Sequence, residues 1–231
     1  MYIKLDKTLE DLLTTLDQKV GKGNYTLFLT ADHGVAEVNT SLMDNRIPAG
    51  YFSNNNMKAN VTEYLSKYFP GKELLENFSN DMIYFNTNSL QVNPRESGVD
   101  MLIASELISK YLLTFNGVAN VFTESVIRQA RFDEEGLKGM VARSYHPKRS
   151  GDLVYVLEPG WTTSGRPQGA SHGTPYTYDT HIPILFYGKG IKAGYSVEKH
   201  SITDIAPTLT ILLKTKFPNA CTGQPVKELF E

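Results

Sequence analysis

The sequence contains one cysteine, Cys221, among its 231 residues. An intramolecular disulfide and a cysteine-rich zinc site are therefore excluded, so any metal must be held by His, Asp and Glu. No apolar run approaches the roughly 18 residues that a transmembrane helix needs, so no membrane span is expected. The opening residues, 1–6, also lack the apolar segment of a signal peptide.

An excess of basic residues is likewise missing. Lys and Arg together number 23 against 25 Asp and Glu, which gives a net charge of −2, and no basic run exceeds the pair Lys148-Arg149. This balance argues against a nucleic-acid binding face or an anionic membrane as partner. With 41% hydrophobic and 21% charged residues, the composition is that of an ordinary globular protein.

The periodicity at the start of the chain predicts half of a parallel α/β unit. Leucines at positions 5, 9, 12, 13 and 16 recur at helical spacing, which predicts a helix over residues 3–20. The apolar run Tyr25–Thr30 then predicts a buried central strand. A second buried strand is expected over Ile182–Tyr187, followed by a helix from Thr203 to about Leu213.

The middle of the chain has a different character, which predicts an insertion over about residues 39–145 that packs on the main sheet. No linker rich in Pro, Gly or Ser bounds it, so a separate domain is disfavoured. The elements expected here are a loop over 39–56, helices over 57–69 and 97–115, strands over 82–85 and 119–122, and a broken helix over 123–145. A further strand is expected over Asp152–Leu157.

The first chemical signal is Thr30-Ala31-Asp32-His33-Gly34, at the end of the first predicted strand. Ligands gather beyond the carboxyl ends of strands in open α/β sheets. A carboxylate and an imidazole side by side there are good zinc ligands, and the glycine allows the backbone to turn. Taken alone, the motif also fits a helix-capping Asp beside an ordinary histidine.

The second signal is a loop, Gly169–Tyr176, in which His172 lies between small residues, followed by Tyr178–Pro183. Such a loop lets an imidazole approach a ligand closely, although by itself it also fits a polar surface turn. Arg166 could meet a phosphate, but a solvated loop arginine is the favoured interpretation. The aromatic residues nearby, including Trp161, are interpreted as packing.

Together with Thr203-Asp204-Ile205-Ala206-Pro207-Thr208, these motifs resemble the alkaline phosphatase superfamily. The resemblance is to bacterial zinc phosphomonoesterases with a threonine nucleophile and to nucleotide pyrophosphatase/phosphodiesterases, and it covers residues 1–50 and 150–231. It implies an α/β fold with three α/β/α layers and a mostly parallel central sheet. Residues 1–231 would form one partial domain of this kind, carrying the α+β insertion.

The resemblance also implies roles. Asp32 and His33 would ligate the metal nearer the nucleophile, and His172 would ligate a second metal, both ions being Zn²⁺ and the substrate a small phosphate ester. Asp179 and His181 would support the ligands without touching the metal. The family further suggests a periplasmic or cell-surface setting.

Other family parts are absent from this sequence. The threonine or serine nucleophile and a D-x-x-x-H pair of ligands are expected upstream, so no catalytic residue is assigned in this chain. The chain is therefore interpreted as a C-terminal fragment that binds zinc weakly or not at all and is inactive by itself. Whether the parent cleaves monoesters or diesters stays open.

Two further alternatives are kept. Sulfatases and cofactor-independent phosphoglycerate mutases also belong to the superfamily, but their motifs fit less well. The other alternative is a non-catalytic binding or assembly domain that retains the alkaline-phosphatase-like sheet.

Overall fold

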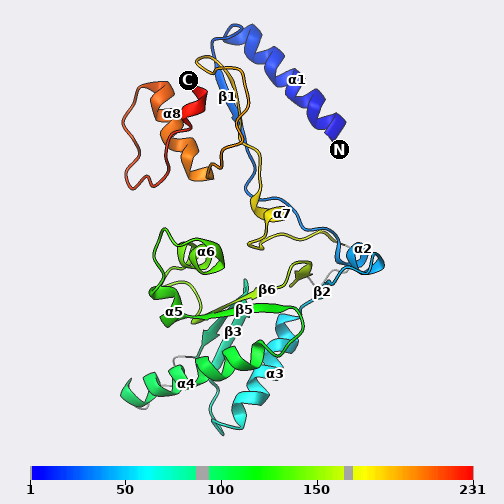
Figure 1. The fold of residues 1–231 in the computed structure, drawn as a ribbon, viewed down its shortest axis with the longest axis vertical. Coiled ribbons are helices and arrows are strands. Elements are labelled where there is room, and N and C mark those ends of the chain that lie inside the picture. The colour runs from blue at the N-terminus through cyan, green and yellow to red at the C-terminus, as the bar shows by residue number, and fades with distance from the viewer. Residues whose placement is uncertain (1, 87–93, 164–168, 231) are drawn as a thin grey trace. The chain divides into compact units, whose positions relative to one another are not determined.

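The computed structural model describes residues 2–86, 94–163 and 169–230. The chain forms two compact units, and Figure 1 shows the elements of each. Unit 1 combines Met1–Asp32 with Ile182–Glu231, and unit 2 is His33–His181. Within the described residues, no helix is long and apolar enough to span a bilayer.

Unit 1 contains the predicted N-terminal helix and the strand that follows it. Its elements are α1 (Tyr2–Lys19), β1 (Thr26–Leu29), β8 (Leu185–Gly188), the 3₁₀ turn η1 (Ile202–Asp204), α8 (Ile205–Leu213) and the 3₁₀ turn η2 (Lys227–Leu229). β1 pairs with β8 in antiparallel register, with Thr26 opposite Gly188 and Leu29 opposite Leu185.

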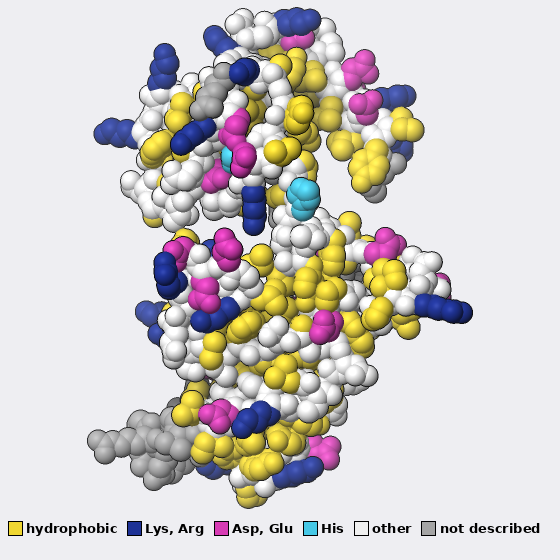
Figure 2. Space-filling view, in the orientation of Figure 1, with side chains coloured by type: hydrophobic (Ala, Val, Ile, Leu, Met, Phe, Trp, Pro, Cys, Tyr) yellow, Lys and Arg dark blue, Asp and Glu magenta, His cyan; other side chains and the backbone are white. Residues whose placement is uncertain are grey.

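The strands of unit 1 are less buried than their apolar sequences predict. Leu29 is 39% exposed and Leu185 is 55% exposed, and no residue of α1 is buried. Figure 2 shows hydrophobic side chains on the surface of this unit, in the upper part of the view. Both predicted strands form. The prediction that they are buried is wrong.

The polar residues of the α8 region hold the end of the chain in place. The Asp204 carboxylate accepts a hydrogen bond from the Gln224 amide at 2.8 Å. The buried Thr208 hydroxyl donates to the Asp204 carbonyl at 2.6 Å and accepts from the Val226 amide at 2.9 Å. The Thr-Asp-Ile-Ala-Pro-Thr motif therefore has a structural role in unit 1.

Unit 2 is built around a sheet with strand order β3-β4-β6-β5, in which every pair is antiparallel. A separate parallel pair joins β2 to β7. The elements of unit 2 are α2 (Asn39–Asp44), β2 (Gly50–Tyr51), α3 (Asn54–Ser66), β3 (Leu75–Ser79), β4 (Met82–Phe85), α4 (Pro94–Leu112), β5 (Val118–Thr123), α5 (Glu124–Arg128), α6 (Gly136–Ser144), β6 (Leu153–Leu157), β7 (Trp161–Thr162) and α7 (Thr177–Thr180).

Strand β6 divides the core of unit 2 in two. Side chains alternate across a strand, so Leu153, Tyr155 and Leu157 join one buried cluster with residues of α3 and α4. Val154 and Val156 join a second cluster with residues of α5 and α6. Figure 1 shows these helix pairs on opposite sides of the sheet. Every residue of β6 is buried as a result.

The predicted α/β class is confirmed, but the sheet arrangement is mixed where a mostly parallel sheet was expected. An unbroken apolar run reports that both faces of a strand are covered, and it does not report the direction of its neighbours. In β6 the cover comes from helices on both faces of an antiparallel sheet. The predicted insertion, 39–145, lies inside unit 2, which extends further to include β6. Its status as an insertion stays a prediction.

Candidate metal centre and adjoining pocket

The segment after His33 runs along the loop that carries His172. The Gly34 amide donates to the Asp179 carbonyl at 2.7 Å, and the Ala36 amide donates to the Ser171 carbonyl at 2.8 Å. A side chain at position 34 would place its Cβ 2.1 Å from the Tyr178 carbonyl oxygen. Glycine is therefore required for this close approach.

These backbone contacts bring two predicted ligands together. The rings of His33 and His172 are stacked, with centroids 3.6 Å apart and planes inclined by 6°. The His33 Nδ1 lies 2.7 Å from the Gly34 carbonyl oxygen. Because a carbonyl can only accept, Nδ1 carries the proton, and Nε2 is the nitrogen with the lone pair that a metal needs.

Asp32 is the third predicted ligand. It is the last residue of the first segment of unit 1, and His33 is the first residue of unit 2. No group of three or more His, Cys, Asp or Glu side chains within the described ranges is arranged to hold a metal ion. The donor set at hand in unit 2 is thus a pair of imidazoles, which suits zinc chemically but leaves most of a tetrahedral shell to other groups.

Asp179 holds the loop around His172. It is 3% exposed, and its Oδ2 accepts from both the amide and the hydroxyl of Thr174, at 2.7 and 2.8 Å. Its buried Oδ1 has no hydrogen-bond partner among the described residues. Asp179 thus supports the loop directly, and its expected role in supporting an imidazole ligand stays a prediction. His181 is exposed at the end of α7, where its amide donates to the Thr177 carbonyl.

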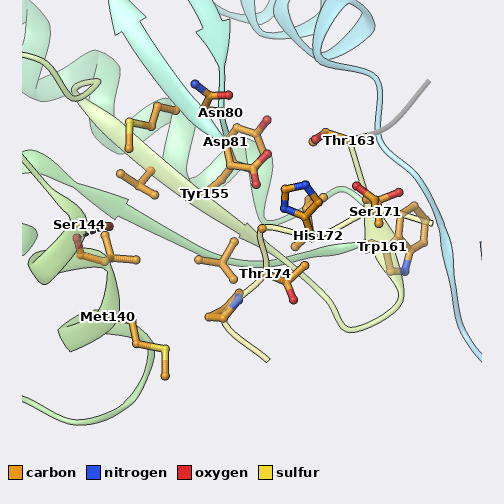
Figure 3. Close-up of a pocket in the computed structure, with 18 of the residues that line it drawn as sticks. Asn80, Asp81, Met140, Ser144, Tyr155, Trp161, Thr163, Ser171, His172 and Thr174 are labelled. Atoms are coloured by element: carbon orange, nitrogen blue, oxygen red, sulfur yellow. Dashed lines mark hydrogen bonds between the residues drawn. The ribbon is translucent and has the colours of Figure 1, made fainter. Parts of the chain in front are cut away.

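A cavity of about 400 Å³ lies in unit 2, with His172 on its wall (Figure 3). The apolar side chains around it include Met82, Met140, Val154, Leu157 and Trp161. The polar part comes from Asn80, Asp81, Thr162, Thr163, Ser171 and Thr174.

Asp81 is the acidic residue of this wall, and it comes from the turn between β3 and β4. Asn80 and Asp81 have φ values of 51° and 57°, and Ser79 pairs with Met82 across the turn. Two left-handed residues are the mark of a type I′ hairpin, which favours Asn, Asp and Gly. Burial raises the pKa of Asp81 to about 6, and the Tyr155 hydroxyl opposes this in part.

Sequence reasoning missed Asp81 because an Asn-Asp pair between two strands already has an adequate explanation as a turn. Only the strand order brings this turn to the loop of His172. Trp161, interpreted as packing, lies against Gly50 and Gly117 and also lines the cavity. Arg166 lies outside the described residues.

Comparison with known proteins identifies the family. The family model for type I phosphodiesterase / nucleotide pyrophosphatase matches residues 1–181. The chain belongs to this family. The predicted kinship with the alkaline phosphatase superfamily is confirmed, and the family is one of phosphate-ester hydrolases.

The sequence similarity between this phosphodiesterase-family chain and its relatives extends over almost the whole chain. It is 33% identical to alkaline phosphatase PafA of Elizabethkingia meningoseptica over 99% of its length, and 33% identical to alkaline phosphatase PhoV of Synechococcus elongatus over its whole length. It is also 35% identical to a protein of Myroides odoratus named calcium-transporting ATPase.

The fold shows the same kinship. The crystal structure of wild-type alkaline phosphatase PafA matches the whole chain with a TM-score of 0.89 and 33% identity, which covers 43% of that chain. The chain spans about two fifths of the length of these curated relatives, 41% for PafA and 40% for PhoV.

Proposed function

We propose that this chain supplies part of a two-metal site in a phosphate-ester hydrolase. Asp32 and His33 hold one divalent cation, and His172 holds the second. The observation that carries this proposal is the stack of His33 on His172 at 3.6 Å, formed by residues of two separate family motifs.

The chemistry of the ions follows from the donor set. Imidazole nitrogen and carboxylate oxygen suit Zn²⁺, and bound zinc would polarise the phosphoryl group and hold the attacking and leaving oxygens in line. The chain's own residues orient the ligands. Gly34 permits the backbone contact with Tyr178, the Gly34 carbonyl sets the His33 tautomer, and Asp179 holds the loop at Thr174.

The complete enzyme requires groups that this sequence does not contain. We infer that the nucleophile and the remaining ligands belong to another part of the parent protein, so the chain alone binds zinc weakly. The substrate is a small phosphate ester, either a monoester or a diester. The periplasmic or cell-surface setting is proposed on the family resemblance alone.

Metal binding by the 231-residue chain tests this proposal. Cobalt(II), which reports its ligands by absorption, is titrated into the chain and into the His33→Ala, His172→Ala and His146→Ala variants. We expect weak binding that the first two substitutions abolish. His146→Ala is the matched control, because that ring is exposed in a loop and accepts a bond from the Lys148 amide. Cobalt binding that survives the loss of both His33 and His172 would contradict their assignment as metal ligands.

Hydrolysis is measured in parallel with p-nitrophenyl phosphate and excess zinc. We expect no turnover above the metal-only background, since the nucleophile is absent. Robust turnover by the purified chain would contradict the fragment interpretation.

A further inference from the structure

We propose that the cavity beside His172 binds the alcohol part of the phosphate ester, as an apolar group that directs a cationic N–H donor at Asp81. The inference rests on the proposed function, because it is the metal site that would place the phosphate at His172. It adds a binding site and a class of ligand to that function.

The size and lining of the cavity fit an organic group better than water or an ion. At about 400 Å³ it lies within the range of small-molecule sites, which are mostly apolar with few polar groups. Met82, Met140, Val154 and Leu157 contribute apolar side chains, and Trp161 contributes an aromatic one. Such a wall gains free energy by removing a hydrocarbon or aromatic ring from water.

Asp81 supplies the polar recognition. The type I′ turn needs a residue that tolerates positive φ, and Asn or Gly would serve it without placing a charge there. The structure instead has a carboxylate whose Oδ1 is buried and has no hydrogen-bond partner among the residues described. Because Asp81 lines the cavity, its carboxylate offers a negative charge to a donor group on a ligand.

Thr162 is a second polar residue of the cavity wall. It is 5% exposed, it lines the cavity, and its hydroxyl also has no partner in the described part of the chain. Both polar groups and His172 belong to the wall of one cavity, and Figure 3 shows Asp81 and His172 among its labelled residues. A ligand with its phosphate at His172 would extend its organic part along the apolar wall.

The test compares two probes that differ by one donor group. Tyramine and 4-ethylphenol share a phenol ring and a two-carbon chain, and only tyramine ends in an ammonium group. Binding of each to the 231-residue chain is measured by titration calorimetry or by shifts of backbone NMR signals. We expect tyramine to bind about tenfold more tightly than 4-ethylphenol, because only its ammonium group can form a hydrogen bond with the Asp81 carboxylate in which both partners are charged.

The variant Asp81→Asn removes the charge and keeps the turn, since Asn tolerates positive φ as Asp does. We expect it to remove the preference for tyramine and to leave 4-ethylphenol binding within about twofold of wild type. Asp133→Asn is the matched control, because that carboxylate is exposed and pairs with Arg131 outside the cavity. Equal affinity for both probes in the wild type, or a preference that survives Asp81→Asn, would overturn the proposal.

A third probe links the cavity to the phosphate. O-phosphotyramine with zinc should shift the NMR signals of both Asp81 and His172, whereas tyramine should shift those of Asp81 and the apolar wall. A response at His172 without one at Asp81 would refute the role in binding the alcohol part. Tyramine binding needs no metal, so loss of cobalt binding in the previous experiment would defeat the proposed function and leave this result standing.

Discussion

At the scale of single residues, backbone contacts and buried carboxylates shape the candidate site. Gly34 lets the chain pass the Tyr178 carbonyl, so that His33 reaches His172. Asp179 fixes the loop through Thr174, and Asp81 places a carboxylate in the cavity wall. Each of these residues has a role that its neighbours in sequence do not reveal.

Replacing Gly34 by alanine should separate the two imidazoles. The new Cβ would lie 2.1 Å from the Tyr178 carbonyl oxygen, so the backbone must move. We expect a loss of about 1–3 kcal/mol in the free energy of unfolding, as for other overpacked sites. Urea denaturation measures the loss, and the cobalt titration should weaken in the same variant.

Gly194→Ala is the control for that substitution. A methyl group added at Gly194 would have no atom within 4 Å, and the φ of this residue is not in the left-handed region. The stability of this variant should stay within about 0.5 kcal/mol of wild type. A Gly34→Ala chain as stable as Gly194→Ala would mean that the contact with Tyr178 is not maintained in solution.

The raised pKa of Asp81 predicts a pH dependence of stability. The ordinary carboxyl has a pKa of 3.8 and the folded one a pKa of about 6, so between these values the folded state binds more protons than the unfolded state. The contribution of Asp81 to the free energy of unfolding therefore falls as the pH rises from about 4 to 6.

Asp81→Asn should remove this dependence. Relative to wild type, the variant should gain about 1–3 kcal/mol between about pH 4 and pH 7, measured by urea denaturation at both values. Parallel stability profiles for the two proteins would show that the carboxyl is not buried as described.

At the scale of elements, β6 organises unit 2 because each of its faces belongs to a different core. The antiparallel neighbours β4 and β5 cover its edges, and helices cover its faces. Helix α1 is the opposite case, since none of its residues is buried. Stability should therefore be distributed very unevenly among elements of similar apolar content.

Truncation within β6 should be costly. Leu153 is 0% exposed, and Leu153→Ala should lower the free energy of unfolding by about 2–5 kcal/mol. Leu12→Ala on α1 is the matched control, because Leu12 is 43% exposed and its loss should cost no more than about 0.5 kcal/mol. Equal costs in urea denaturation would contradict this description of the core.

At the scale of the whole molecule, the chain divides into units of unequal packing. Unit 2 holds both buried hydrophobic clusters, whereas in unit 1 the β1–β8 pair leaves apolar side chains exposed. Helices without tertiary packing are marginal in water. Unit 1 should therefore open more readily than the sheet of unit 2.

Hydrogen exchange can test this difference directly. We expect amides of β6 and α4 to exchange slowest, with the free energy of global unfolding, and amides of α1 to exchange with little protection. Mass spectrometry of peptides from each element measures both rates in one experiment. Protection of α1 equal to that of β6 would show that unit 1 is packed as tightly as unit 2.

Local patterns in the sequence were sufficient for several elements and for the family. Leucine spacing predicted α1, and the strand predicted over residues 82–85 is β4. The Asp-His-Gly and Ser-His-Gly motifs indicated His33 and His172, and the structure stacks these rings. Periodicity and turn chemistry are local properties, so they can be read without knowing what lies across the sheet.

Only the tertiary structure decided strand direction, burial and the cavity. The apolar run of β6 reports two covered faces, yet nothing in it distinguishes parallel from antiparallel neighbours. The strands β1 and β8 look buried in sequence, but burial depends on what packs against them. Asp81 and His172 are far apart in the chain, and they share a cavity because β4 pairs with β6. The proximity of two such residues depends on strand order, which no short segment of the chain encodes.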